Sequence, residues 1–173
     1  EGFLGRWMQR GYTLRKHLVY KLQQYFVWTP GAMFSGNPWP AGDPSRMQHP
    51  VLKEADAVVL HWINHGFLGS SDLRALLNLG KPVLWHMHDQ WASTGGCHYS
   101  GACTAFENSC GTCPQLRRRG PGDRSRRQFM ERQQWAAQAG DRLALVAPSE
   151  WLAGMAAKSG IVRGSGAWVR CIP

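Results

Sequence analysis

The stretch from Trp85 to Leu116 constrains the fold of this chain more than any other. It begins at the end of an apolar run, and its last part, from Gly95 onward, holds four of the five cysteines. Glycines are frequent in this part and large apolar side chains are few. We therefore expect the loop to need something other than a hydrophobic core to become ordered.

The spacing of these cysteines suits a structural metal. Five residues separate Cys97 from Cys103, and two separate Cys110 from Cys113, which is a typical zinc half-site. The first pair lacks that spacing, so unligated thiols and a disulfide or redox pair stay open, and His98 can replace one ligand. We predict a structural zinc ion held by Cys97, Cys103, Cys110 and Cys113.

Short apolar runs alternate with helical patterns over the rest of the chain. Strands are predicted at residues 56–61, 83–86, 142–147 and 167–172, and helices at 70–80, 123–139 and 149–160. This alternation predicts an α/β fold, a Rossmann-like open parallel sheet with helices on both faces and a cysteine-rich loop insertion.

We expect one domain over residues 1–173, truncated from a longer protein because the chain opens with Glu. Its parts are a helix and loop at residues 1–50, a βαβ unit at 51–96, the cysteine-rich loop at 97–116 and a second α/β part at 117–173.

An apolar stripe recurs every fourth residue from Tyr12 to Trp28 and predicts a basic amphipathic helix. Such a helix can lie on a membrane surface, but we favour packing on its own domain. No apolar run is long enough to span a membrane, and a signal peptide is missing. We expect a cytoplasmic protein, with a peripheral position at the inner face of the plasma membrane as an option.

The chain carries a net charge of +9, and seven arginines fall between Arg117 and Arg132. This density favours an anionic partner such as a membrane surface, although a solvated loop and helix face is an equal alternative. A nucleic-acid partner is not expected, because aromatic residues do not alternate with the arginines. A zinc-stabilised basic module that binds nucleic acid or docks on membranes is the alternative to the enzyme described below.

Polar and aromatic side chains follow the ends of three predicted strands. The candidates are His61, Trp62, Asn64, His65 and Gly66 after the first strand, His88, Asp89, Trp91 and Thr94 after the second, and Ser149 after the third. A histidine near a strand end is more often structural than functional. The carboxyl ends of parallel strands share one edge of a sheet. Because candidate side chains follow three such ends, they predict a ligand site at this edge.

Three segments resemble one group of family 4 glycosyltransferases. They are Leu-His-Trp-Ile-Asn-x-Gly-Phe-Leu at residues 60–68, His-Asp-x-Trp followed by Thr-Gly-Gly-Cys-His-Tyr-Ser-Gly and Cys-Gly-x-Cys-Pro-Gln-Leu at 88–116, and Pro-Ser-x-Trp-Leu-Ala at 148–153. The resemblance implies the N-terminal, acceptor-binding half of a GT-B enzyme. Such an enzyme moves a sugar, with retention, from a nucleotide-sugar donor to a glycan or lipid-linked acceptor in bacterial polysaccharide biosynthesis. This half alone is expected to be inactive.

The same resemblance gives His88 and Asp89 catalytic roles. His88 matches a histidine that faces the donor sugar and its phosphates, and Asp89 can orient it or accept a hydrogen bond from an acceptor hydroxyl. Retention argues against Asp89 as a general base. The rings of Trp62 and Trp91 suit sugar faces. Departures from the family pattern at His86, Gln90 and Ser93 leave donor and acceptor preference open.

Overall fold

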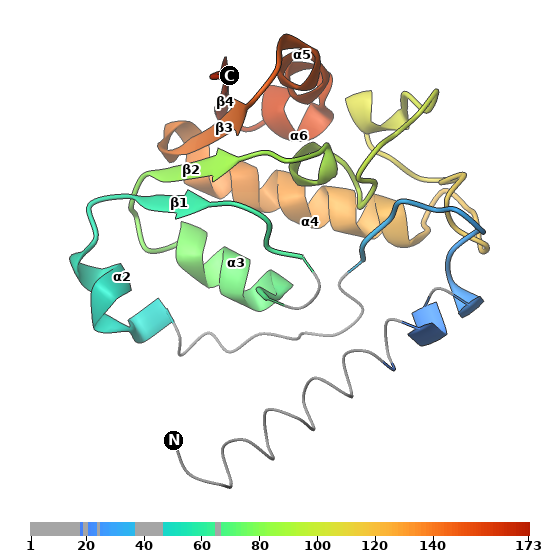
Figure 1. The fold of residues 1–173 in the computed structure, drawn as a ribbon, viewed down its shortest axis with the longest axis horizontal. Helices are drawn as coiled ribbons and strands as arrows, with labels where there is room; N and C mark the ends of the chain where they lie inside the picture. The colour runs from blue at the N-terminus through green and yellow to red at the C-terminus, as the bar shows by residue number, and fades with distance from the viewer. Residues whose placement is uncertain (1–17, 19–20, 24, 37–46, 65–66) are drawn as a thin grey trace, which may run out of the picture.

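The computed structural model describes residues 18, 21–23, 25–36, 47–64 and 67–173. Its centre is a four-stranded parallel sheet in the order β1-β2-β3-β4 (Figure 1). The strands are β1 (Val58–Leu60), β2 (Val83–His86), β3 (Leu143–Ala147) and β4 (Trp168–Cys171). All four predicted strands are present, and the predicted α/β, Rossmann-like arrangement of a parallel sheet with helices around it is confirmed.

The three helices predicted at 70–80, 123–139 and 149–160 are present. The helices of the structure are α2 (Pro50–Glu54), α3 (Ser70–Leu77), α4 (Arg124–Ala139), α5 (Glu150–Lys158) and α6 (Gly160–Arg163), with 3-10 turns η2 (Trp91–Ser93), η3 (Ala105–Glu107) and η4 (Gly140–Arg142). Helix α4 begins and ends where its capping residues predict. The Asp123 carboxylate accepts from the N–H groups of Ser125 and Arg126 at the start of α4. Gly140 ends that helix with φ +57°, a conformation that glycine adopts without strain.

Two helical features differ from the prediction. The helix expected from Ser149 to Gly160 is interrupted at Ser159, whose hydroxyl donates to the carbonyl of Ser93 at 2.7 Å and accepts from the Ile161 N–H. Because that hydroxyl caps a new helix, α6 starts one residue later. The short helix α2 was not predicted. The His49 side chain caps it, and Pro50 occupies its first position.

The main core lies on one face of the sheet. Val58, Leu60, Val83, Trp85 and Leu145 point to this face and pack with the buried residues of the crossover helices α3, α4, α5 and α6. Side chains alternate along a strand, so residues such as Val59 point to the opposite face, where Val59 is 57% exposed. The same alternation sends His61 and His86, which follow Leu60 and Trp85, to this opposite face.

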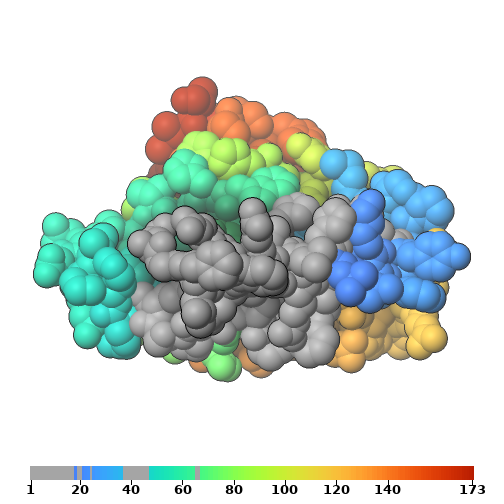
Figure 2. Space-filling view, turned by 60° about the horizontal axis from the view of Figure 1, so that its bottom comes forward, coloured from blue at the N-terminus to red at the C-terminus, as the bar shows by residue number. Residues whose placement is uncertain are grey.

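A second, smaller core lies under the cysteine-rich loop. It consists of Trp28, Phe34, Cys97, Cys113 and Leu116. Two antiparallel bridges, from Trp28 to Leu116 and from Phe34 to Cys97, tie the N-terminal segment to the loop. Figure 2 shows this segment, in blue, beside the yellow and orange residues that follow the cysteines. The expectation that the loop lacks a hydrophobic core is therefore wrong.

The predicted helix from Tyr12 to Trp28 lies partly outside the described residues. Its described part is helical at residues 18, 21–23 and 25–26. There the apolar stripe is exposed, 59% at Leu18 and 71% at Tyr25, whereas Gln23 is buried, so the described stripe residues do not pack on the domain as expected. In the described part of the chain, no helix is long and apolar enough to cross a membrane.

Candidate functional site

A hollow lies at the carboxyl ends of β1 and β2, and its volume of about 250 Å³ includes part of the open solvent outside it. Most of its lining comes from the segments that leave these two strands. The residues around it are His61, Trp62, Ile63, Asn64, Trp85, Met87, His88, Asp89, Trp91 and Ala92. Six of the predicted site residues therefore lie together: His61, Trp62, Asn64, His88, Asp89 and Trp91.

The buried Asp89 carboxylate holds His98 rather than His88. Asp89 Oδ2 lies 2.7 Å from His98 Nδ1, and Asp89 Oδ1 accepts from the Trp91 N–H at 2.7 Å. The other nitrogen of His98 lies 2.7 Å from the Ser35 hydroxyl, so His98 is not free to replace a cysteine at a metal. The ring of Trp62 stacks on His98, with centroids 5.1 Å apart and planes 5° apart. Asp89 thus positions, through His98, an aromatic face at the hollow.

Sequence reasoning did not identify Ser35 or His98 as part of this site. Ser35 is 63 residues from His98 in the sequence, and no local pattern connects the two. The available signal was weak, namely a histidine in a glycine-rich loop.

Trp91 is fixed from two sides. Its indole N–H donates to the Ser35 carbonyl at 2.8 Å, and the Arg132 guanidinium lies 3.7 Å from the ring centroid. Arg132 also donates to the carbonyls of Trp91 and Thr94. Burial lowers the pKa of Arg132 to about 10, so it is still charged at neutral pH. The Trp91 ring is therefore held rigidly at the wall of the hollow.

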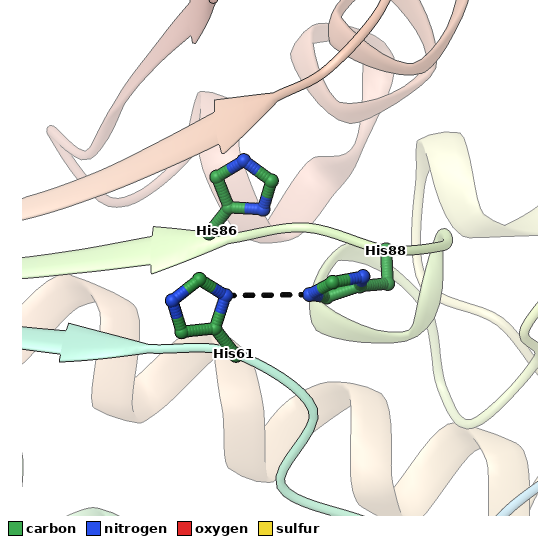
Figure 3. A group of neighbouring side chains, drawn as sticks. All are labelled: His61, His86 and His88. Carbon is green, nitrogen blue, oxygen red and sulfur yellow. Dashed lines mark hydrogen bonds between the residues drawn. The ribbon is translucent and has the colours of Figure 1, made fainter.

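Three histidines cluster beside the hollow (Figure 3). His61 Nδ1 lies 3.3 Å from His88 Nε2, and the His86 ring lies 5.2 Å from the His61 ring and 5.3 Å from the His88 ring. Burial, together with the nearby His61 and His88, lowers the pKa of His86. His86 was not among the predicted site residues, because it belongs to the strand itself.

Thr94 and Ser149, the other predicted site residues that the structure describes, do not line the hollow. Thr94 is buried, and its hydroxyl bonds the Cys97 carbonyl at 2.7 Å and the Gly96 N–H, which shapes the loop. Ser149 caps α5 by accepting from the Leu152 N–H. His65 and Gly66 lie outside the described residues.

Comparison with known proteins gives a partial match. Over 85 residues, 43% of this chain, the sequence is 25% identical to a putative colanic acid biosynthesis glycosyl transferase, WcaC, of Escherichia coli (strain K12). The matched part is 20% of that protein's length. The chain is related to a glycosyltransferase. No protein-family model matches the chain, and no solved structure matches it.

The five cysteines of the chain are free thiols, and two of them are in contact. Cys97 Sγ and Cys113 Sγ are buried and 4.0 Å apart. This hydrogen bond and burial raise the pKa of Cys97, and the same bond lowers the pKa of Cys113. Among the described residues, the four sulfurs do not form a group with three members all within 4.8 Å of one another. Zinc binding here would require the loop to draw Cys103 and Cys110 closer.

The arginine segment divides into an exposed and a buried part. Arg117, Arg118, Arg119 and Arg127 are exposed, whereas Arg132 is buried beneath Trp91 and does not belong to the predicted basic surface. The Arg117 N–H donates to the Val27 carbonyl at 2.9 Å. Arg117 therefore lies beside Val27, directly after the N-terminal helix.

Proposed function

We propose that this chain is the N-terminal, acceptor-binding part of a GT-B glycosyltransferase of family 4. The enzyme would move a sugar, with retention, from a nucleotide sugar to a glycan or lipid-linked acceptor in polysaccharide biosynthesis. The observation that carries the proposal is the hollow at the strand ends, where six residues selected from the sequence meet. The relationship to a glycosyltransferase and the parallel α/β sheet support it.

The hollow offers the groups that a sugar needs. Trp62 is 47% exposed and presents a flat apolar ring, already oriented by its stacking on His98. His61 and His88 are exposed at the rim and can donate hydrogen bonds to hydroxyl or phosphate oxygens. Asp89 acts indirectly, because both of its oxygens are already hydrogen-bonded to His98 and Trp91. We therefore assign His88 a direct contact with substrate and Asp89 a positioning role.

Saccharide binding tests the proposal. Saturation-transfer NMR with a panel of monosaccharides, oligosaccharides and nucleotide sugars would identify ligands of residues 1–173. Trp62→Ala should weaken binding of the best ligand by about tenfold or more, equivalent to about 1.4 kcal/mol. The matched control is Trp151→Ala, because Trp151 is 56% exposed and lies outside the hollow. Equal binding by wild type and Trp62→Ala would contradict the proposed site.

Catalysis is proposed to need more than this chain, since the match covers a fifth of the relative's length. Residues 1–173 should give no sugar transfer above background with any nucleotide sugar. Appreciable turnover by this chain alone would contradict this part of the proposal.

A second candidate function is docking on an anionic membrane. The exposed apolar residues Tyr25 and Phe26 directly precede Val27, whose carbonyl accepts a hydrogen bond from the N–H of the exposed Arg117. Apolar side chains beside basic ones suit an acidic lipid surface. Replacing Arg117, Arg118 and Arg119 together by Gln should reduce sedimentation with phosphatidylserine vesicles. Wild-type protein that fails to sediment with these vesicles at low salt would exclude this function.

A further inference from the structure

The three clustered histidines come from two adjacent strand ends, and the fold determines where their side chains point. Leu60 of β1 pairs with Trp85 of β2, so continuing this register places His61 beside His86. His88 follows the buried Met87 and therefore points to the same side as His86. Figure 3 shows the three rings gathered around one space.

The spacing of the ring nitrogens matches a metal site. One nitrogen of each ring lies within 4.8 Å of one nitrogen of each of the other two. Zinc–nitrogen bonds of about 2.0–2.1 Å in a tetrahedron place two ligand nitrogens about 3.3–3.4 Å apart. His61 Nδ1 and His88 Nε2 are 3.3 Å apart, so this pair already has that separation.

A hydrogen bond between two neutral imidazoles also explains the contact between His61 and His88. It does not explain His86, whose buried Nδ1 has no hydrogen-bond partner among the described residues. A buried polar atom without a partner is costly, and such a group in a native structure calls for an explanation such as an ion or water. Side chains that share one cation would account for all three rings together.

We propose that His61, His86 and His88 bind one divalent transition-metal ion, zinc, through three imidazole nitrogens. Three histidines leave the fourth position of a tetrahedral zinc open. His61 and His88 also line the hollow, so that position is adjacent to it and can take a water molecule or an anionic oxygen such as that of a phosphate. Imidazole donors suit zinc, copper and nickel, and exclude magnesium and calcium as preferred occupants.

This site does not depend on the proposed sugar transfer. His86 does not line the hollow, and Trp62, which does, offers no metal ligand. Substitutions at these two positions therefore separate the two proposals. His86→Gln should weaken zinc binding at least tenfold and retain saccharide binding, while Trp62→Ala should weaken saccharide binding and retain zinc binding.

The test is zinc and cobalt binding to untagged protein of residues 1–173 in a buffer free of chelators. Isothermal titration with zinc should show a site that His86→Gln weakens at least tenfold. His61→Gln, at an exposed position, should give the same loss without the packing change that His86→Gln can cause. The control is His49→Asn, because His49 is exposed at the start of α2 and asparagine also caps helices.

Cobalt distinguishes this site from the cysteines. Cobalt bound by three imidazoles should give visible d–d absorption without the near-ultraviolet charge-transfer band of a cobalt–thiolate site, and His86→Gln should remove that contribution. Identical zinc titrations for wild type, His86→Gln and His61→Gln would overturn the proposal. A cobalt spectrum that shows thiolate bands alone, unchanged by His86→Gln, would overturn it as well.

Discussion

Asp89 controls the shape of the site through two short contacts, one to His98 and one to the Trp91 N–H. Asp89→Asn keeps the size of the side chain and removes its charge. We expect it to lower the free energy of unfolding by about 1–3 kcal/mol, because a charge-assisted bond is lost in a buried place. Urea unfolding followed by tryptophan fluorescence measures this change.

Asp141→Asn is the matched control, since Asp141 is exposed in η4. This substitution should change the free energy of unfolding by no more than about 0.5 kcal/mol. If Asp89→Asn is as stable as this control and binds saccharide as wild type does, the positioning role is wrong.

Gly95 lies where the cysteine-rich loop passes the first turn of α4. A Cβ added at Gly95 would stand 2.2 Å from the Ser125 carbonyl oxygen, and this backbone atom cannot move without shifting the helix. Gly95→Ala should therefore lower the free energy of unfolding by roughly 1–3 kcal/mol. A Cβ added at Gly122 meets nothing within 4 Å, so Gly122→Ala should be nearly neutral. Similar midpoints of urea unfolding for the two variants would show that Gly95 does not pack this closely against the Ser125 carbonyl.

The sequence indicates which residues lie together at the strand ends but not which of them form hydrogen bonds with one another. Asp89 was expected to orient His88 or to accept a hydrogen bond from an acceptor hydroxyl. The carboxylate instead meets His98, and Ser35 completes the contact from a distant segment. Local spacing holds no information about such pairs.

Helix α4 supports the wall of the hollow through Arg132. Its guanidinium contacts the Trp91 ring and donates to two carbonyls of the segment around η2. Arg132→Met keeps the length of the side chain but leaves these carbonyls without their donor. We expect a loss of about 2–4 kcal/mol in the free energy of unfolding and weaker saccharide binding.

The comparison variant is Arg127→Met, because Arg127 is exposed on the same helix. It should change neither stability nor saccharide binding appreciably. Unchanged saccharide binding by a folded Arg132→Met protein would show that Trp91 does not need this support.

For the cysteine-rich loop we propose a structural zinc ion at Cys97, Cys103, Cys110 and Cys113. Two of the sulfurs are already 4.0 Å apart, near the roughly 3.8 Å expected for two thiolates on one tetrahedral zinc. Mercurial titration of the thiols should release about one equivalent of zinc, detected with a chromophoric chelator. Cys110→Ser should lower this release and leave the histidine site intact. Thiol modification that releases no zinc from freshly prepared protein contradicts the proposal.

The helices and strands were predictable where residues near their ends, or an apolar run within them, determine where they lie. Asp123 and Gly140 mark the ends of α4 as expected, and the apolar run at Val83 became β2. The division of α5 from α6 was not predictable, since it depends on the contact between Ser159 and Ser93. Likewise, the small core under the cysteines needs Trp28 and Phe34 from another part of the chain.

Across the whole molecule, the parallel sheet places the hollow and the histidine cluster along the same edge. Strand order β1-β2-β3-β4 puts the ends of β1 and β2 side by side, and both sites are built from the residues that leave these two strands. The alternation of strands and helices predicted the parallel sheet, but not the histidine cluster. It did not predict that the stripe at Leu18 and Leu22 is exposed, because periodicity shows an apolar face without showing what covers it.

The proposed function depends on a sugar binding in the hollow. The most direct measurement is a crystal structure of the protein with the saccharide that binds best in the NMR panel. We expect the sugar ring to lie against Trp62, with a hydroxyl or phosphate oxygen within hydrogen-bonding distance of His88. Sugar bound at another place, or an empty hollow at a saturating saccharide concentration, would contradict the account.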